Sequence, residues 1–450
     1  MSVFLVTVFL VAQFHIPGPR KEITMKKLLA LILALIMALM CTAAFADDVG
    51  EPFEKEVFFT MLNSKPEITK ALQAAADQFG AIYKVKIEVV ETSNPGDEIS
   101  KRYNGGEAPT ISVLDIAQVK DLAREGKIID LGGEPWAEVG GRDLGAVIND
   151  VLYGMPLTIE SKANLLNKTA IEKITGEPFD PLKYVTLEDF KALLEQLRAG
   201  GMENPVIINK EDWSIGSHFV QYFYGIQDGT IAGAEAFIEK VRAGEASFKD
   251  DPVFNACMDV FDVYMEYNIN KQDPLSADYD VNASYLAEGE AAFWINGTWA
   301  WPNLEPFAVE GQEYSIMHMP VSAGAQGKLL AQATKFIVVD KQNATEDQQK
   351  AALMLLRWLV FTPEGNDAMI NQCGMVTAFS NITLPPSNPF NVGLKEYIDK
   401  GLTFEAVTYL PSDHRSKLGA NMQKYLDGSE TREEVAAAFD EYWSDHEVNY

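Results

Sequence analysis

The stretch from Tyr285 to Leu304, YLAEGEAAFWINGTWAWPNL, constrains the fold of this chain more than any other. Its apolar run from Ala291 to Ile295 predicts a short buried strand. Asn296-Gly297 is typical of a tight turn, and Thr298 is a candidate N-cap for a helix that follows. A buried strand therefore leads into a helix start and places Trp299 where open α/β sheets bind their ligands.

The spacing of the two tryptophans also fits an ordinary core. Tryptophan is highly buried on average, so spacing alone leaves the alternatives of core and ligand contact open for Trp299. Trp301 lies two residues further on and points to a different side of the helix start. We expect Trp301 to behave as a core residue, although it is kept among the candidate contacts.

The same stretch resembles the signature of a known family. Residues 288–301, EGEAAFWINGTWAW, are similar to the pattern F..G.AAM.ING.WAW.N of the family 1 extracellular solute-binding proteins, the maltose-binding-protein type. Trp294 departs from that pattern, because the family often has Met or Thr there. In the family, the tryptophan that matches Trp299 stacks on bound sugar, so the resemblance implies a carbohydrate contact.

Further matches to this family extend along the chain. Residues 106–131 resemble its G.APD.......L...G.L..L segment, with Thr110 in place of the usual Asp. Residues 151–168 resemble the segment in which its chain first crosses between two lobes, and a glutamate at the position of Glu160 contacts sugar in the maltose-binding type. Residues 358–378 resemble its FL.T.EG segment and the return that follows.

Strand and helix patterns alternate in the first part of the chain. This alternation implies a mostly parallel sheet with helices on both faces. The strands are predicted over Val57–Asn63, Val85–Glu91 and Ile111–Leu114, and the helices over Glu67–Phe79, Glu98–Asn104 and Ile116–Glu125.

The resemblance implies a fold class as well. It is the α/β, periplasmic-binding-protein-like fold of type II, in which two α/β lobes flank a ligand cleft and two or three segments cross between them. We expect lobe one to comprise residues 47–157 and 331–378. Lobe two is then expected to comprise residues 158–330 and 379–450.

Residues 1–46 have the pattern of an export signal. Met25-Lys26-Lys27 precedes the apolar run from Leu28 to Met40, and Ala44-Phe45-Ala46 is a small-x-small cleavage site. Met25 is therefore the expected start, and the mature protein is expected to begin at Asp47 in an extracellular or periplasmic location.

Cysteine usage leaves one alternative for the N-terminus. A lipid anchor on Cys41 would require a small residue before it, and Met40 is not small, so simple cleavage is favoured. Cys257 and Cys373 then remain. They could pair outside the cell, but buried free thiols are the favoured interpretation.

The charge of the chain limits its partners. The sequence holds 65 acidic and 37 basic residues, for a formal net charge of −28. Such an excess of negative charge argues against nucleic acid and against anionic membrane surfaces.

Motifs for catalysis and metal binding are missing from the sequence. None of the five histidines lies in HExxH, and there is no GxSxG, P-loop or GxGxxG. We therefore expect no enzyme activity, no metal and no cofactor. One alternative remains, because the many acidic residues could supply the paired carboxylates of a glycosidase.

Together, the sequence and the resemblance predict a monomeric carbohydrate-binding receptor of an ABC importer, with the permease subunits as partners. The alternatives are the same fold with a non-sugar solute (a polyamine, phosphonate or peptide) and a secreted glycosidase. The candidate ligand contacts are Trp299, Glu160, Asp115, Asn63, Trp213, Trp301, Tyr409 and Arg415.

Overall fold

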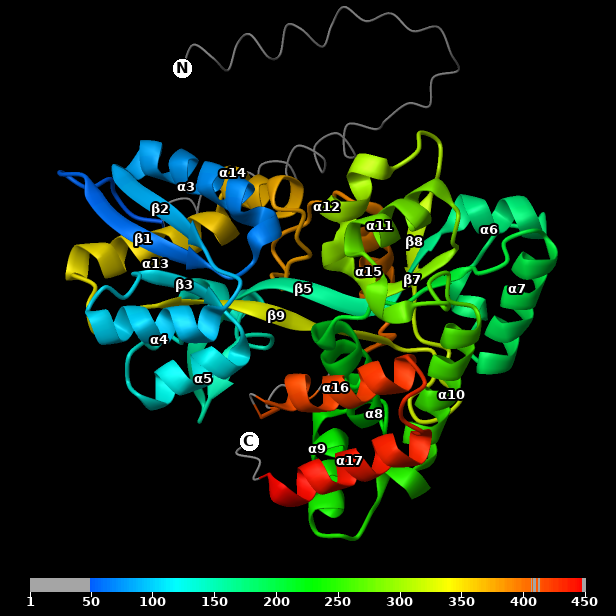
Figure 1. The fold of residues 1–450 in the computed structure, drawn as a ribbon. Coiled ribbons are helices and arrows are strands. Elements are labelled where there is room, and N and C mark those ends of the chain that lie inside the picture. The colour runs from blue at the N-terminus through cyan, green and yellow to red at the C-terminus, as the bar shows by residue number, and fades with distance from the viewer. Residues whose placement is uncertain (1–48, 406, 408–409, 412, 447–450) are drawn as a thin grey trace, which may run out of the picture. The chain divides into compact units, whose positions relative to one another are not determined.

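The computed structural model describes residues 49–405, 407, 410–411 and 413–446, and these are organised around one mixed sheet (Figure 1). The predicted export signal, Cys41 and Tyr409 lie outside the described residues. The strand order is β2-β1-β3-β9-β5-β7-β6, with β10 paired to β9 and both β4 and β8 paired to β5. The strands are β1 Val57–Asn63, β2 Val85–Glu91, β3 Ile111–Leu114, β4 Ala146–Ile148, β5 Val151–Asn167, β6 Val206–Ile207, β7 Phe293–Gly297, β8 Tyr314–Met317, β9 Leu329–Val339 and β10 Thr403–Phe404.

The first three strands have the predicted limits, and β1 pairs in parallel with both β2 and β3. They alternate with α3 (Thr69–Tyr83), which follows the 3-10 turn η1 (Pro66–Ile68), and with α4 (Pro95–Gly105) and α5 (Ile116–Arg124). The β-α alternation predicted for this part of the chain is therefore confirmed, because each parallel pair needs a crossover helix.

The remainder of the sheet corrects the expectation of a mostly parallel arrangement. β9 is antiparallel to β3 and to β5, and β5 is antiparallel to β7 and β8. The reason is that β5 and β9 are long strands that run past each other, with 17 and 11 residues respectively.

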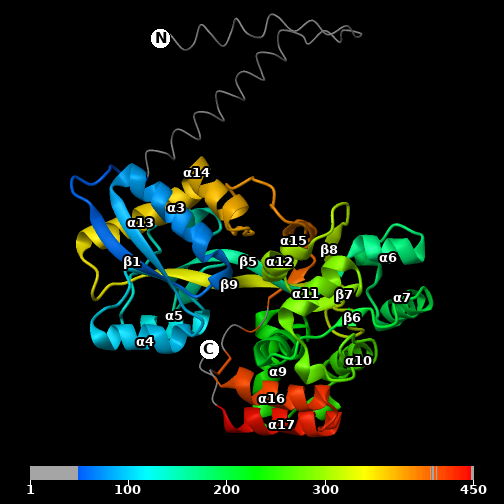
Figure 2. The ribbon, with the colours of Figure 1, turned by 45° about the horizontal axis from the view of Figure 1, so that its top comes forward.

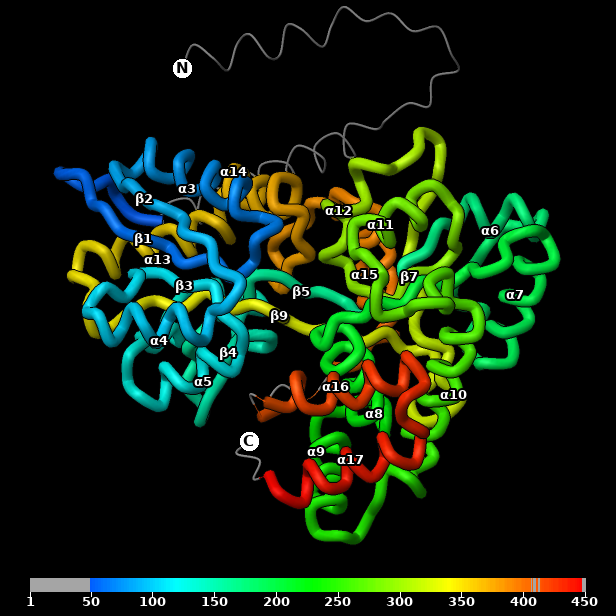
Figure 3. The backbone as a smooth tube through the Cα atoms, in the orientation of Figure 1, coloured from blue at the N-terminus to red at the C-terminus, as the bar shows by residue number. Residues whose placement is uncertain are grey.

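These two strands run between two groups of elements (Figure 3). Each group of elements encloses a large buried core. Met155 of β5 and Ile337 of β9 pair with each other in the first core. Further along the same strands, Leu166 of β5 and Leu330 of β9 belong to the second core. The chain passes between the cores once more between Ile382 and Phe404, so a change in the position of one core relative to the other would involve β5, β9 and this third segment.

The two cores draw on different parts of the chain. Residues of the first lie within 49–157 and 337–382, and residues of the second lie within 166–330 and 404–443. In the first core, Phe79 meets Trp358 edge-on with ring centroids 6.0 Å apart. In the second, Phe190 meets Phe293 at 5.0 Å. The lobe boundaries expected from the sequence stay a prediction.

Among the other helices, α16 and α17 lie side by side, away from the sheet (Figure 2). Within the described part of the chain, no helix combines the length and apolar character needed to cross a membrane. These helices are α6 Lys168–Thr175, α7 Leu187–Ala199, α8 Gln221–Gly225, α9 Ile231–Arg242, α10 Pro252–Glu266, α11 Tyr279–Glu288, α12 Trp301–Leu304, α13 Glu346–Phe361, α14 Pro363–Asp367, α15 Pro389–Asp399, α16 His414–Leu426 and α17 Arg432–Asp445.

Short helical turns connect these elements. Two of them, η4 and η9, are π-helical, a geometry that is rare and frequently found at functional sites. The turns are η2 Pro135–Val139, η3 Pro181–Lys183, η4 Ser214–Phe219, η5 Phe248–Asp250, η6 Pro274–Ser276, η7 Thr298–Ala300, η8 Glu305–Phe307 and η9 Ala368–Gln372.

Candidate functional site

Residues 285–304 form the end of α11, then β7, the turn η7 and α12, with two corrections to the sequence-based prediction. Asn296-Gly297 continues β7 and is not a tight turn, because Gly297 stays paired with Lys162 of β5. Thr298 does not cap a helix. Its hydroxyl oxygen instead accepts a hydrogen bond from the backbone N–H of Ser161 at 3.2 Å. Pairing with β5 thus holds this stretch in the sheet up to Gly297.

Trp299 follows directly, and its ring lies over Gly297. A Cβ atom at Gly297 would come within 2.0 Å of Cζ3 and Cη2 of the indole. Real Cβ atoms do not approach other atoms so closely, so glycine is required for this position of the ring. The indole is only half-buried and lines a cavity.

Three further aromatic rings form a series of successive contacts that begins at Trp299. His218 lies 4.7 Å from it between ring centroids, Trp213 lies 5.4 Å from His218, and Tyr279 lies 5.8 Å from Trp213. We call Trp213, His218, Tyr279 and Trp299 the aromatic group. Burial raises the pKa of Tyr279 to about 12, against hydrogen bonds to Asn296 and Trp299 that lower it, so the phenol stays a hydrogen-bonding group at neutral pH.

The cavity beside Trp299 has a volume of about 300 Å³. Its wall comes from η1, β5, η7, α12, η8, η9 and the start of α15, and it combines two tryptophans with many polar side chains. The lining residues are Lys65, Glu67, Ile68, Thr158, Glu160, Thr298, Trp299, Trp301, Pro302, Glu305, Asn371, Gln372, Cys373, Gly374, Met375, Ser387, Asn388 and Asn391.

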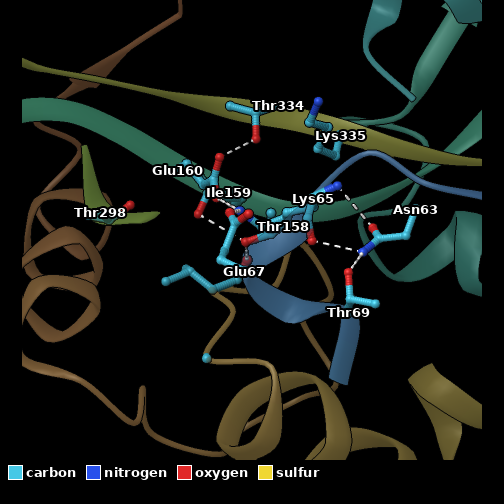
Figure 4. A network of polar contacts seen from close by, with 12 residues as sticks. Asn63, Lys65, Glu67, Thr69, Thr158, Ile159, Glu160, Thr298, Thr334 and Lys335 are labelled. Carbon is cyan, nitrogen blue, oxygen red and sulfur yellow. Dashed lines mark hydrogen bonds and ion pairs between the residues drawn. The ribbon is translucent and has the colours of Figure 1, made fainter. Parts of the chain in front are cut away.

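Glu160 is at the centre of the charged part of this wall (Figure 4). Lys65 donates from Nζ to Glu160 and to Glu67, and the Thr334 hydroxyl donates to Glu160 at 2.5 Å. Burial disfavours both charges, but the pairing outweighs it, so the pKa of Lys65 is raised and the pKa of Glu160 is lowered. Both groups are therefore charged at neutral pH.

Asn63 holds Lys65 in place. Its side-chain N–H groups donate to the Lys65 carbonyl oxygen at 2.8 Å and to the Thr69 hydroxyl at 2.9 Å. The Lys65 backbone N–H donates in return to Oδ1 of Asn63 at 3.0 Å. The buried amide of Asn63 thus fixes the turn after β1 that presents Lys65 to the cavity (Figure 4).

Two more lysines lie near Glu160, one on its own strand β5 and one on the neighbouring strand β9. Lys335 of β9 pairs with Asp115 at 2.7 Å. Lys162 of β5 donates to Oε1 of Gln221 at 2.6 Å. Burial lowers the pKa of Lys162 to about 8, against the nearby charges of Glu160 and Asp115, which raise it. Since Glu160 and Lys162 are two residues apart on one strand, their side chains emerge on the same side of the sheet.

The predicted contacts fall into three sets. Trp299, Glu160 and Trp301 line the cavity. Tyr409 lies outside the described residues. Four predicted contacts are not part of the cavity wall, and each of them makes contacts of its own elsewhere in the structure. These four are Asn63, Asp115, Trp213 and Arg415. All eight assignments stay predictions.

Trp301 differs from the core residue that its spacing suggested. It packs edge-on against Tyr314 and Phe390, at 5.7 and 5.4 Å between ring centroids, yet it remains half-buried. It lines both the cavity beside Trp299 and a second cavity of about 490 Å³. Arg415 is exposed and pairs with Asp212 at 3.3 Å.

Several cavity residues did not emerge from the sequence. The charged pair in Lys65-Pro66-Glu67, directly after the buried strand β1, was a usable signal. Asn371 and Gln372 could not be found in this way, because they reach the wall through the π-helical turn η9, which has no sequence signature.

The two described cysteines are free thiols in different cores. Cys257 is buried in α10, whereas Cys373 is half-buried and lines the cavity. Within the residues that the structure describes, no group of His, Cys, Asp and Glu side chains could hold a metal ion.

The cavity is polar, contains two tryptophans in its wall and lies beside β5, which joins two α/β cores. This arrangement is that of a solute-binding protein. Residues 70–391 match the model of a family described as bacterial extracellular solute-binding protein. The chain belongs to this family.

Solved structures with the same fold include three binding proteins, each named for a different carbohydrate. One is RafE in complex with raffinose, at 18% identity and a TM-score of 0.72, covering 86% of this chain and 99% of that chain. A chitin oligosaccharide binding protein has 15% identity and a TM-score of 0.65, covering 87% and 98%. A manno-oligosaccharide-specific protein from Bifidobacterium animalis subsp. lactis, in complex with mannotriose, has 16% identity and a TM-score of 0.62, covering 86% and 94%.

Proposed function

We propose that this protein is the carbohydrate-binding receptor of an ATP-driven importer and that it binds its sugar without altering it. The observation that carries this proposal is the half-buried indole of Trp299 on a polar cavity. The raffinose, chitin oligosaccharide and mannotriose named for similar structures support the choice of ligand.

The chemistry of the cavity suits a sugar. A pyranose ring has an apolar C–H face that packs on an aromatic face, and such a contact adds to the burial of apolar area. Its hydroxyl groups need both donors and acceptors. Lys65 and the amide of Asn388 can donate, and the oxygens of Glu67 and Glu160 can accept.

Ligand binding would act on the position of the two cores. Lys65 precedes η1 in the first core region, while Glu160 lies on β5. Trp299 packs against a third hydrophobic cluster, which includes Trp294 and Ala300. A sugar that contacts all three stabilises the form in which they are close together, by its differential affinity for that form. The closed form is the one that the membrane permease would recognise.

A cationic solute such as a polyamine fits less well. It would need carboxylates without a cationic partner, and three of the four carboxylates in or near the cavity have one. Glu67 and Glu160 share Lys65, and Asp115 pairs with Lys335, so two of these three negative charges are neutralised before any ligand binds. The fourth is Glu305, which lines the cavity and forms no ion pair with the described residues.

A glycosidase is the second alternative, and it too fits less well. Such an enzyme needs one carboxyl group that keeps its proton near neutral pH, so that it can protonate the leaving oxygen. The carboxyl group of Glu160 lies in the cavity, but its ion pair with Lys65 lowers its pKa. Glu160 is therefore an acceptor of hydrogen bonds and not a proton donor.

Calorimetry with a broad panel of sugars and oligosaccharides tests the proposal, with spermidine and a short peptide as the other solutes. We expect at least one glycan to bind and to be recovered intact by chromatography afterwards. Release of reducing ends would show that the protein is a glycosidase and not a receptor. Binding of spermidine or peptide, without binding of any glycan, would show that the ligand is not a sugar.

We also propose that the protein is exported by the signal in residues 25–46 and begins at Asp47 without a lipid on Cys41. These residues lie outside the described part of the chain, and the proposal rests on their sequence pattern and on the extracellular family. Mass spectrometry of the exported protein tests it, since a diacylglycerol-modified Cys41 would contradict it.

A further inference from the structure

Lys162 is paired unlike the other cations around the site. Lys65 pairs with Glu67 and Glu160, Lys335 with Asp115, and Arg415 with Asp212. For Lys162, the described residues supply no carboxylate within ion-pair distance. Its ammonium donates to one neutral acceptor, the amide oxygen of Gln221, at 2.6 Å.

The surroundings make this pairing costly. Lys162 is only 5% exposed and Gln221 only 7%. An ammonium group has three N–H donors, and a buried charge without a counterion is strongly disfavoured. One acceptor therefore leaves two donors of Lys162 for a group that the described part of the protein does not provide.

Lys162 is not part of the cavity wall, but it lies close in the chain to Glu160, which is. It lies two residues after Glu160 on β5, with its side chain on the same side of the sheet. The charge of Lys162 also acts on His218, whose ring lies 4.7 Å from that of Trp299. The ammonium therefore interacts electrostatically both with Glu160 of the cavity wall and with His218 of the aromatic group.

We propose that the ligand is an acidic glycan, that is, one whose sugar units include a carboxylate, and that this carboxylate binds Lys162. The inference rests on the proposed function and names the substrate class of that site. Two carboxylate oxygens match the two free N–H donors, and their single negative charge matches the single uncompensated cation. In a uronic acid the carboxylate is attached to the same ring whose C–H face would pack on Trp299.

The experiment compares two ligands that differ only at C6. Trigalacturonate carries carboxylates where α-1,4-linked galactotriose carries hydroxymethyl groups, and further pairs of uronate and neutral oligosaccharides extend the panel. Calorimetry on the purified protein should give an affinity at least about tenfold higher for the acidic member of the pair that binds, as a charge-assisted hydrogen bond implies. Equal or tighter binding of the neutral member would overturn the inference.

Two variants locate the preference. Lys162→Met should remove the advantage of the acidic ligand, and Lys86→Met, which removes an exposed lysine from β2, should keep it. If Lys162→Met keeps the preference, Lys162 is not the partner of the carboxylate and the inference fails. If Lys162→Met does not fold, the salt dependence of the wild-type protein decides, because only an ionic contact weakens as salt is added.

The two proposals fail differently. A neutral glycan bound tightly by the wild-type protein, with no preference for uronates, would leave the carbohydrate receptor intact and overturn only the acidic ligand. If no glycan in the panel binds, while spermidine or peptide does, both proposals are wrong.

Discussion

At the scale of single residues, Trp299 decides whether the proposed sugar site is correct. We expect Trp299→Ala to weaken glycan binding by about 1–3 kcal/mol, the contribution of an aromatic face. Its effect on folding should be smaller, since the indole is half-buried without ligand. Calorimetry gives the affinity, and urea unfolding gives the free energy of unfolding.

Trp294 is the matched control for that experiment. It lies on β7 five residues before Trp299, is fully buried, and donates from its indole N–H to Asn209 at 2.8 Å. Trp294→Ala should lower the free energy of unfolding by about 3–5 kcal/mol, as for other buried tryptophans. If Trp299→Ala destabilises as strongly and the folded fraction binds normally, Trp299 is a core residue.

Gly297 provides a second prediction at this scale. A Cβ atom there would collide with the indole of Trp299, so Gly297→Ala should displace the ring and weaken binding by about 1–2 kcal/mol, within the range for overpacking. The double variant Gly297→Ala, Trp299→Ala tests whether Gly297 acts through the indole ring. If it does, the two losses of affinity should not add. Additive losses of affinity would show that Gly297 acts independently of Trp299.

At the scale of elements, the sequence predicts best where one element has one buried face. β1 alternates between buried and more exposed residues over its first half and follows a period of two, so its limits could be predicted. Glu160 and Lys162 lie in the middle of β5, and no alternation marks that strand, because it passes from one core to the other. The resemblance supplied the importance of Glu160, but not its partner Lys65.

The Asn-Gly dipeptide shows why the site itself was only partly predictable. By local preference Asn296-Gly297 favours a turn. In the structure the glycine has an extended backbone, with φ −140° and ψ 169°, since its role is to make room for Trp299. Local preference cannot distinguish a glycine needed for a turn from one needed for close packing.

The π-helical turn η4 supports a prediction about packing between elements. Gly216 of η4 meets Gly419 of α16, and a Cβ atom on Gly216 would lie 2.2 Å from the Gly419 Cα. Gly216→Ala should therefore push α16 away and cost about 1–3 kcal/mol of the free energy of unfolding. Since Arg415 lies on α16, the same change tests by calorimetry whether Arg415 takes part in binding.

Gly105→Ala is the control for that variant. Gly105 ends α4, and a Cβ atom on it would meet nothing within 4 Å. Alanine favours a helix over glycine, so this change should be neutral or stabilise the protein by up to about 1 kcal/mol. Equal effects of the two substitutions in urea unfolding would show that the contact between η4 and α16 is looser than the structure indicates.

At the scale of the whole molecule, the two cores share one sheet, and the region of the second core holds two buried histidines that couple folding to pH. His318 and His414 are almost fully buried. The Tyr397 hydroxyl contacts Nδ1 of His318 at 2.8 Å, and the Tyr224 hydroxyl contacts Nε2 of His414 at 2.8 Å. Burial lowers the pKa of His318 to about 4 and the pKa of His414 to about 3.

These two histidines should make the protein sensitive to mild acid. In the unfolded chain each takes up a proton near its ordinary pKa of 6.5, whereas in the folded protein each stays neutral down to about pH 4. Their contribution to stability is therefore complete above pH 6.5 and is lost as the pH falls. Burial also lowers the pKa of His218. With one proton taken up on unfolding by each of the three histidines, the slope approaches about 4 kcal/mol per pH unit.

Urea unfolding between pH 7 and pH 5 measures this slope. Glu405, whose pKa burial raises, acts in the opposite sense, but its contribution is the same in the wild-type protein and in the histidine variants. His318→Gln and His414→Gln should each reduce the slope by about a third, whatever they do to stability at pH 7, because each removes one of the three protons that His218, His318 and His414 take up on unfolding. A slope unchanged in both variants would mean that the acid sensitivity arises from other groups, and that these histidines are hydrated in solution.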